Sequence, residues 1–159
     1  MTRILTLTAL LLALAVAAPG EASAAPRGPL WATVNACAPN TVGMRASVPG
    51  DGTAKQQFVR FSAQWWSQLK QDWLPLGGTP DSPWLPAGSA LSISSQAGWT
   101  FSIQQPPPGA VFLIRGIAQI QWRDGDRVAR SSTRVTRPGA PGVLESNPVG
   151  TSRGSCQLP

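Results

Sequence analysis

The sequence predicts an all-β protein, a single antiparallel β-sandwich of about seven to eight strands, from three observations. Apolar residues recur mostly at every second position, the spacing of a strand with one buried face. Gly, Pro, Asn and Asp residues interrupt this pattern at the spacing of turns between short strands. The third observation is that helical periodicity is missing after the first 25 residues. Together these features favour two packed sheets.

The first 24 residues predict a secretory signal peptide. Arg3 supplies the basic start, residues 4–18 form an apolar run, and Ala22-Ser23-Ala24 provides the small residues that a signal peptidase reads. Cleavage is expected after Ala24. The run is shorter than the roughly 20 apolar residues that span a bilayer. We therefore expect a secreted, extracellular protein whose mature chain, residues 25–159, is one domain without a transmembrane segment.

The first half of the mature chain contains four predicted strands. They cover residues 30–37, 44–48, 56–66 and 73–76, and a Pro-Gly-Asp-Gly turn follows the second. In the third strand, Phe61 shares its buried face with Val59, while Arg60 and Trp66 point the other way. Pro75 suits an edge strand, because a missing N–H donor is tolerated there.

The second half predicts a surface loop, two strands and a long hairpin. Residues 77–88 are rich in Gly and Pro and form the loop, residues 90–94 a short edge strand, and residues 99–104 another strand. The hairpin covers residues 111–137 and turns around Asp124-Gly125-Asp126. From Pro138 onward, Gly and Pro predict an irregular tail.

Alternation along the hairpin predicts a loop with an even number of residues. A two-residue turn at Asp124-Gly125 pairs Ile120 with Ala129 and Ile114 with Val135, which keeps both apolar sets on one face. A three-residue loop would place Ile120 opposite Arg130. The resulting core prediction comprises Phe61, Trp99, Ile114 and Ile120.

Two segments resemble secreted bacterial immunoglobulin-like and fibronectin type III-like domains. Arg60-Phe61-Ser62-Ala63-Gln64 followed by Trp73-Leu74-Pro75 resembles their middle hairpin. Phe112-Leu113-Ile114-Arg115-Gly116 followed by Gln121-Trp122-Arg123-Asp124-Gly125-Asp126 resembles their final hairpin. The resemblance implies an immunoglobulin-like sandwich and no particular activity. The chain departs from the antibody pattern, because its cysteines lie near the two ends and not in facing central strands.

Cys37 and Cys156 are the only cysteines, and export would carry them to an oxidising compartment, where two lone cysteines usually pair. Their disulfide would attach the C-terminal tail to the first strand. The chain-entropy model gives a stabilisation of roughly 4–5 kcal/mol for so long a loop, as an upper figure. Free thiols or an intermolecular bond are the alternatives.

No catalytic residue, metal ligand set or cofactor site is predicted. The chain lacks His, the commonest general base and metal ligand. Six carboxylates remain after the signal peptide, and Asp51, Asp124 and Asp126 belong to turn sequences. A small secreted hydrolase is the least favoured alternative, since two carboxylates across a cleft can hydrolyse a glycoside.

Exposed Trp and Arg side chains are the candidate binding residues. Trp66 faces outward and Trp84 lies in the Pro-rich loop, so either could stack on a sugar or cover a sheet edge. Alternation places Arg60, Arg115, Arg130 and Arg134 together on one face, with Arg115 opposite Arg134. Like charges in that position would favour a bound anion, although a solvated face is the simpler interpretation.

The leading hypothesis is a secreted or cell-envelope-associated, non-enzymatic binding or structural module. The alternative is a carbohydrate-binding module that uses Trp66 and Trp84. The formal net charge of +6 favours an anionic envelope polymer or polysaccharide, with another exported protein as a further candidate. Export disfavours nucleic acid as the partner.

Overall fold

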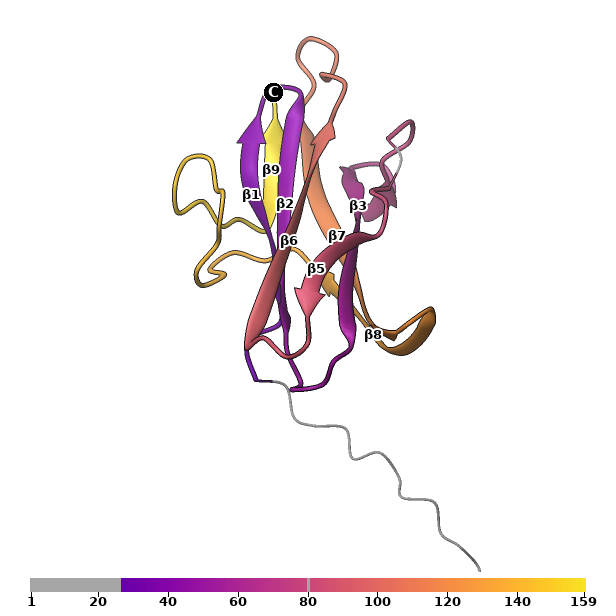
Figure 1. The fold of residues 1–159 in the computed structure, drawn as a ribbon. Helices are drawn as coiled ribbons and strands as arrows, with labels where there is room; N and C mark the ends of the chain where they lie inside the picture. The colour runs from indigo at the N-terminus through magenta and orange to yellow at the C-terminus, as the bar shows by residue number, and fades with distance from the viewer. Residues whose placement is uncertain (1–26, 80) are drawn as a thin grey trace, which may run out of the picture.

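Nine strands form two antiparallel sheets in the computed structural model, which describes residues 27–79 and 81–159 (Figure 1). The signal peptide predicted for residues 1–24 lies outside the described residues. Within the described ranges there are strands and turns and no helix, and so no helix long and apolar enough to cross a membrane. The prediction of an all-β, sandwich-like fold is confirmed.

The smaller sheet has three strands in the order β1-β2-β6. These are β1 (Trp31–Ala38), β2 (Thr41–Pro49) and β6 (Ser94–Ser102). Nearly every residue of the central strand β2 is buried, because both faces of this sheet are covered. The six-stranded sheet covers its inner face.

The larger sheet has β3 (Gln56–Ser67) and β7 (Phe112–Asp124) at its centre, paired over ten residues. Two short strands, β4 (Asp72–Pro75) and β5 (Leu85–Ser89), share the other edge of β3. Likewise β8 (Arg127–Val135) and β9 (Ser155–Leu158) share the other edge of β7. The long strands β3 and β7 therefore expose one broad outward face.

The core lies between the two sheets, as the alternation of apolar residues predicted. Phe61, Ile114 and Ile120 are fully buried there, and Trp122 is 1% exposed. Trp99 was also predicted to be buried, but that prediction is wrong, since its side chain is 36% exposed. Trp99 belongs to β6, an edge strand, and pairs with Met44 of β2. At this edge the facing sheet covers the Trp99 side chain only in part.

The β7–β8 hairpin has the predicted two-residue loop, but its register differs. The loop residues are Gly125 and Asp126, and a bulge in β8 follows, so Ile120 pairs with Ser132 and not with Ala129. The extra residue moves every later residue of β8 to the opposite face. Arg130 and Arg134 therefore share the side of Trp122, and Ser131 and Thr133 point outward.

Two further segment predictions are wrong. Residues 85–88, predicted as part of a loop, belong to β5 because they pair with the first half of β3. Residues 90–93, predicted as an edge strand, form the turn between β5 and β6. In that turn, the carbonyl of Ala90 accepts hydrogen bonds from the N–H groups of Asp51 and Gly52, which joins the two turns at this end of the sandwich.

The disulfide between Cys37 and Cys156 is confirmed. It joins β1 to β9, so the C-terminal tail does not remain irregular to its end. Residues 138–154, which precede β9, lie against the outward side of the three-stranded sheet, where Asn35 and Gln96 donate hydrogen bonds to the carbonyls of Glu145 and Gly142. Glu145 forms an ion pair with Arg45 there, and the hydroxyl of Thr33 is within 2.9 Å of that of Ser152.

Candidate ligand-binding face

The outward side of the six-stranded sheet, called here the outer face, gathers most aromatic side chains that are not in the core. Alternation along β3 and β7 places even-numbered residues of β3 and odd-numbered residues of β7 on it. No further layer covers it in the part of the chain that the structure describes. Its principal members are Phe58, Arg60, Gln64, Trp66, Trp73, Arg115, Gln119, Gln121 and Arg123.

One aromatic–arginine cluster lies at the β4 end of the outer face. The rings of Trp66 and Trp73 meet edge to face, with centroids 5.5 Å apart. The guanidinium of Arg115 lies 4.4 Å from the centroid of Trp73, and its Nε–H donates a 2.8 Å hydrogen bond to Oε1 of Gln64. These contacts hold the guanidinium plane in place while leaving its terminal nitrogens available.

A second aromatic–arginine cluster lies near the hairpin end. The guanidinium of Arg123 is 4.5 Å from the ring centroid of Phe58 and 5.0 Å from that of Trp84. Its Nε–H donates a 2.8 Å hydrogen bond to Gln121. Trp84 reaches the outer face because β5 begins at the next position and pairs with β3.

An open hollow of about 230 Å³ adjoins this second cluster. Trp84 borders it, and the polar residues around it are Gln119, Gln121, Ser131, Ser132 and Thr133. Amide and hydroxyl groups beside an aromatic ring can both stack on a sugar and hydrogen-bond to its hydroxyls. The hollow thus adds neutral polar groups to a face that otherwise offers guanidinium groups.

Two guanidinium groups on this face have no carboxylate within ion-pair distance among the described residues. These are Arg115 and Arg123, whereas Arg60 pairs with Asp81 at 2.9 Å. Burial lowers the pKa of Arg115 below its ordinary value, and the charge of Asp72 opposes this shift. Because an arginine pKa lies far above neutrality, the side chain stays charged.

The structure brings four of the six predicted binding residues together. Trp66, Trp84, Arg60 and Arg115 all lie on the outer face. Arg130 and Arg134 do not, because the β8 bulge turns them to the inner side. The prediction that all four arginines share one face is therefore wrong, and Arg115 pairs with Gln64 and Ser155 and not with Arg134.

Sequence reasoning missed Trp73 and Phe58 as members of the face, and it placed Arg123 there without naming it a candidate binding residue. The parity of β3 does indicate Phe58, and that of β7 indicates Arg123. No pattern in the sequence shows that Trp73 and Trp84 reach the same face, since that depends on β4 and β5 sharing one edge of β3. For the same reason, the sequence does not show that Ser131 and Thr133 lie on this face.

The described residues contain no group of three or more His, Cys, Asp or Glu side chains that could hold a metal ion. No protein-family model matches the chain, and no curated protein matches it either. The outer face must therefore be interpreted from its own chemistry.

Proposed function

We propose that the protein is an exported, non-enzymatic binding module whose outer face holds an acidic polysaccharide chain. The observation that carries this proposal is the pair of aromatic–arginine clusters, one at each end of an uncovered sheet face. Each cluster combines a ring that can stack on a sugar with a guanidinium that can pair with a carboxylate. Glutamine and hydroxyl groups between them suit the sugar hydroxyls.

The length of the face supports an extended ligand. Arg115 and Arg123 are eight positions apart on β7, which at about 3.3 Å per residue is about 26 Å. That separation exceeds what one sugar can reach, so a polymer with repeated negative charges would engage both clusters at once. Two linked contacts bind more tightly than either alone.

We also propose that the sandwich is immunoglobulin-like. Strands β1, β2 and β6 in one sheet and β3, β7 and β8 in the other correspond to the ABE and CFG groups of that fold. In this comparison the outer face is the exposed side of the CFG sheet. The cysteine positions differ, because the bond here joins β1 to the additional strand β9.

A protein partner is the competing occupant of this face, since Trp and Arg are also enriched at protein interfaces. Two features favour the polysaccharide. The aromatic rings are half-buried and do not project as anchors, and polar side chains line most of the hollow beside Trp84. Export also places the protein where envelope polysaccharides occur.

Titration calorimetry with polygalacturonate and with neutral dextran tests the proposal. We expect binding to polygalacturonate only, weakened as salt shortens the screening length from about 10 Å at 0.1 M to about 3 Å at 1 M. The variants Trp73→Ala and Arg115→Gln should each weaken it about tenfold, or ~1.4 kcal/mol.

Arg127→Gln is the matched control for this titration. It removes the same charge from the exposed hairpin tip, where Arg127 pairs with Asp124 and belongs to neither cluster. Equal losses in Arg127→Gln and Arg115→Gln would mean that net charge alone drives binding. That result, or no binding of polygalacturonate by the parent protein, would contradict the proposed function.

A further inference from the structure

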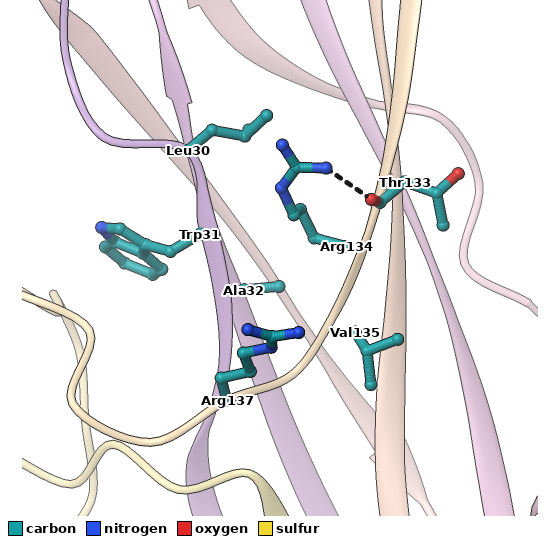
Figure 2. Close-up of a pocket in the computed structure, with 7 residues that line it drawn as sticks. All are labelled: Leu30, Trp31, Ala32, Thr133, Arg134, Val135 and Arg137. Atoms are coloured by element: carbon teal, nitrogen blue, oxygen red, sulfur yellow. Dashed lines mark hydrogen bonds between the residues drawn. The ribbon is translucent and has the colours of Figure 1, made fainter.

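A groove runs between β1 and β8, on the inner side of β8 and so on the opposite side of the larger sheet from the outer face. Leu30 and Ala32 line one wall, and Arg134 and Arg137 face them across the gap (Figure 2). This lobe has a volume of about 400 Å³. A second lobe of about 290 Å³ continues over Trp122, and the two lobes share Leu30 and Arg134.

The bulge in β8 explains why the sandwich stays open here. It turns Arg130, Ser132 and Arg134 toward the inner side, where β1 would otherwise pack. Charged side chains cannot be buried under an apolar strand without a partner, so the two edges stay apart. The two edges meet where the N–H of Arg137 donates a 2.8 Å hydrogen bond to the carbonyl of Ala32.

Contacts within the protein position two of the groove arginines. The guanidinium of Arg130 lies 3.6 Å from the ring centroid of Trp122, a buried residue whose Nε1–H donates to the carbonyl of Pro49. One terminal nitrogen of Arg134 donates to the carbonyl of Thr133 at 2.9 Å and to the hydroxyl of Ser132 at 3.1 Å. A stacked or tethered guanidinium loses less freedom when it binds an anion.

The groove is a region of uncompensated positive charge. Within residues 27–79 and 81–159, no carboxylate lies at ion-pair distance from Arg130, Arg134 or Arg137. The charge of Arg130 does reach Asp51, but Oδ1 of that carboxylate already accepts hydrogen bonds from the N–H and hydroxyl of Thr53. The Ala32 N–H points to the same edge as its carbonyl and adds a neutral donor.

We propose that the groove between β1 and β8 binds a small organic anion. Arg134 and Arg137 hold its carboxylate or phosphate group, and its apolar part lies against Leu30 and extends into the second lobe. Arginine suits both oxyanions, because its planar fork can pair with two oxygens at once. The first lobe alone has the volume of a small-molecule site, and the second lobe extends it.

Protection of an edge strand is the competing explanation, since inward-pointing charges on an edge strand deter unwanted strand pairing. That role requires no bound ligand. If this were their only role, Arg130, Arg134 and Arg137 would be interchangeable with the other charged residue of this edge, Arg127 at the hairpin end of β8. A ligand site instead requires an anion and an apolar part together, which gives a direct test.

The test titrates the purified protein with octanoate and octyl phosphate and follows backbone amide shifts by NMR. Neutral octanol tests the need for charge, and acetate and inorganic phosphate test the need for the apolar part. We expect saturable shifts at Ala32 and Arg137 with octanoate or octyl phosphate, at least tenfold tighter than with octanol, acetate or phosphate. The tighter of the two eight-carbon anions identifies the preferred head group.

Variants complete the test. Arg134→Gln should weaken binding at least tenfold, and Arg127→Gln, an equal charge change on the same strand, should leave it unchanged. Equal binding of octanol, equal effects of both variants, or no binding would overturn the proposal. So would acetate and phosphate binding as tightly as the eight-carbon anions, which would indicate an adventitious ion only. Because the groove and the outer face lie on opposite sides of the sheet, either proposal can fail alone.

Discussion

Two isoleucines of β7 lie on opposite faces of the larger sheet and differ in burial. Ile114 is fully buried in the core, whereas Ile117, three positions later, is half-buried on the outer face. We expect Ile114→Ala to lower the free energy of unfolding by about 2–5 kcal/mol, because it leaves a cavity. Ile117→Ala should cost less than half as much. Urea denaturation measures both, and equal losses would contradict this assignment of faces.

Gly50 shows a different constraint at the residue scale. A Cβ at this position would overlap the carbonyl oxygens of Ser92 and Ala90, which belong to the backbone and cannot rotate away. Gly50→Ala should therefore lower the melting temperature strongly. Gly77→Ala is the control, because a Cβ there would meet nothing within 4 Å. A Gly50→Ala protein as stable as the control would show that this turn can shift freely.

Asp51 should make stability depend on pH. Desolvation raises the pKa of its carboxyl, but hydrogen bonds from Thr53 and the charges of Lys55 and Arg130 outweigh it, so the pKa lies below its ordinary value. A lowered folded-state pKa stabilises the protein above the unfolded pKa of about 3.9, and this contribution is lost as pH falls through the folded-state value.

The variant Asp51→Asn isolates this contribution. It should unfold more easily than the parent at about pH 7, and the difference should shrink at about pH 3. Asp126→Asn, at the exposed hairpin tip, serves as the control. A difference between parent and Asp51→Asn that is the same at both pH values would rule out the charge of Asp51 as its source.

At the scale of elements, β9 is the strand that the sequence pattern does not predict. The Gly and Pro residues after Pro138 predict an irregular tail, but Cys156 and Leu158 are buried and pair with β7. Leu158→Ala should cost about 2–5 kcal/mol even with the disulfide intact. The control is Val149→Ala, in the exposed segment before β9. Chemical denaturation under non-reducing conditions measures the free energy of unfolding of both variants. An unchanged value for Leu158→Ala would mean that β9 contributes little to the core.

The contrast between β3 and β8 shows what alternation can and cannot predict. In β3, alternation placed Phe61 and Trp66 on their correct faces, because no bulge interrupts its pairing with β7. In β8, one extra residue after the turn reversed the faces of Arg130 and Arg134. A bulge leaves little trace in a sequence of Ser, Thr and Arg, none of which strongly prefers one face.

At the scale of the whole molecule, the residues that the structure describes form two separate basic regions in place of the single one that alternation predicts. The outer face combines Arg115 and Arg123 with stacked aromatic rings, and the β1–β8 groove combines Arg130 and Arg134 with apolar walls. Their separation depends on the strand order and on the hairpin bulge, which are long-range features. Composition alone could give the sign of the charge but not its division between two sides of a sheet.

The most direct measurement of the central claim is an NMR footprint of a galacturonate oligomer on the isotope-labelled protein. We expect the largest amide and indole shifts at Trp73, Trp84, Arg115 and Arg123, on the outer face. Residues of β1, β2 and β6 should remain unaffected. Shifts confined to the three-stranded sheet, or no shifts at concentrations that saturate a weak binding module, would contradict the assignment of the outer face as the ligand-binding surface.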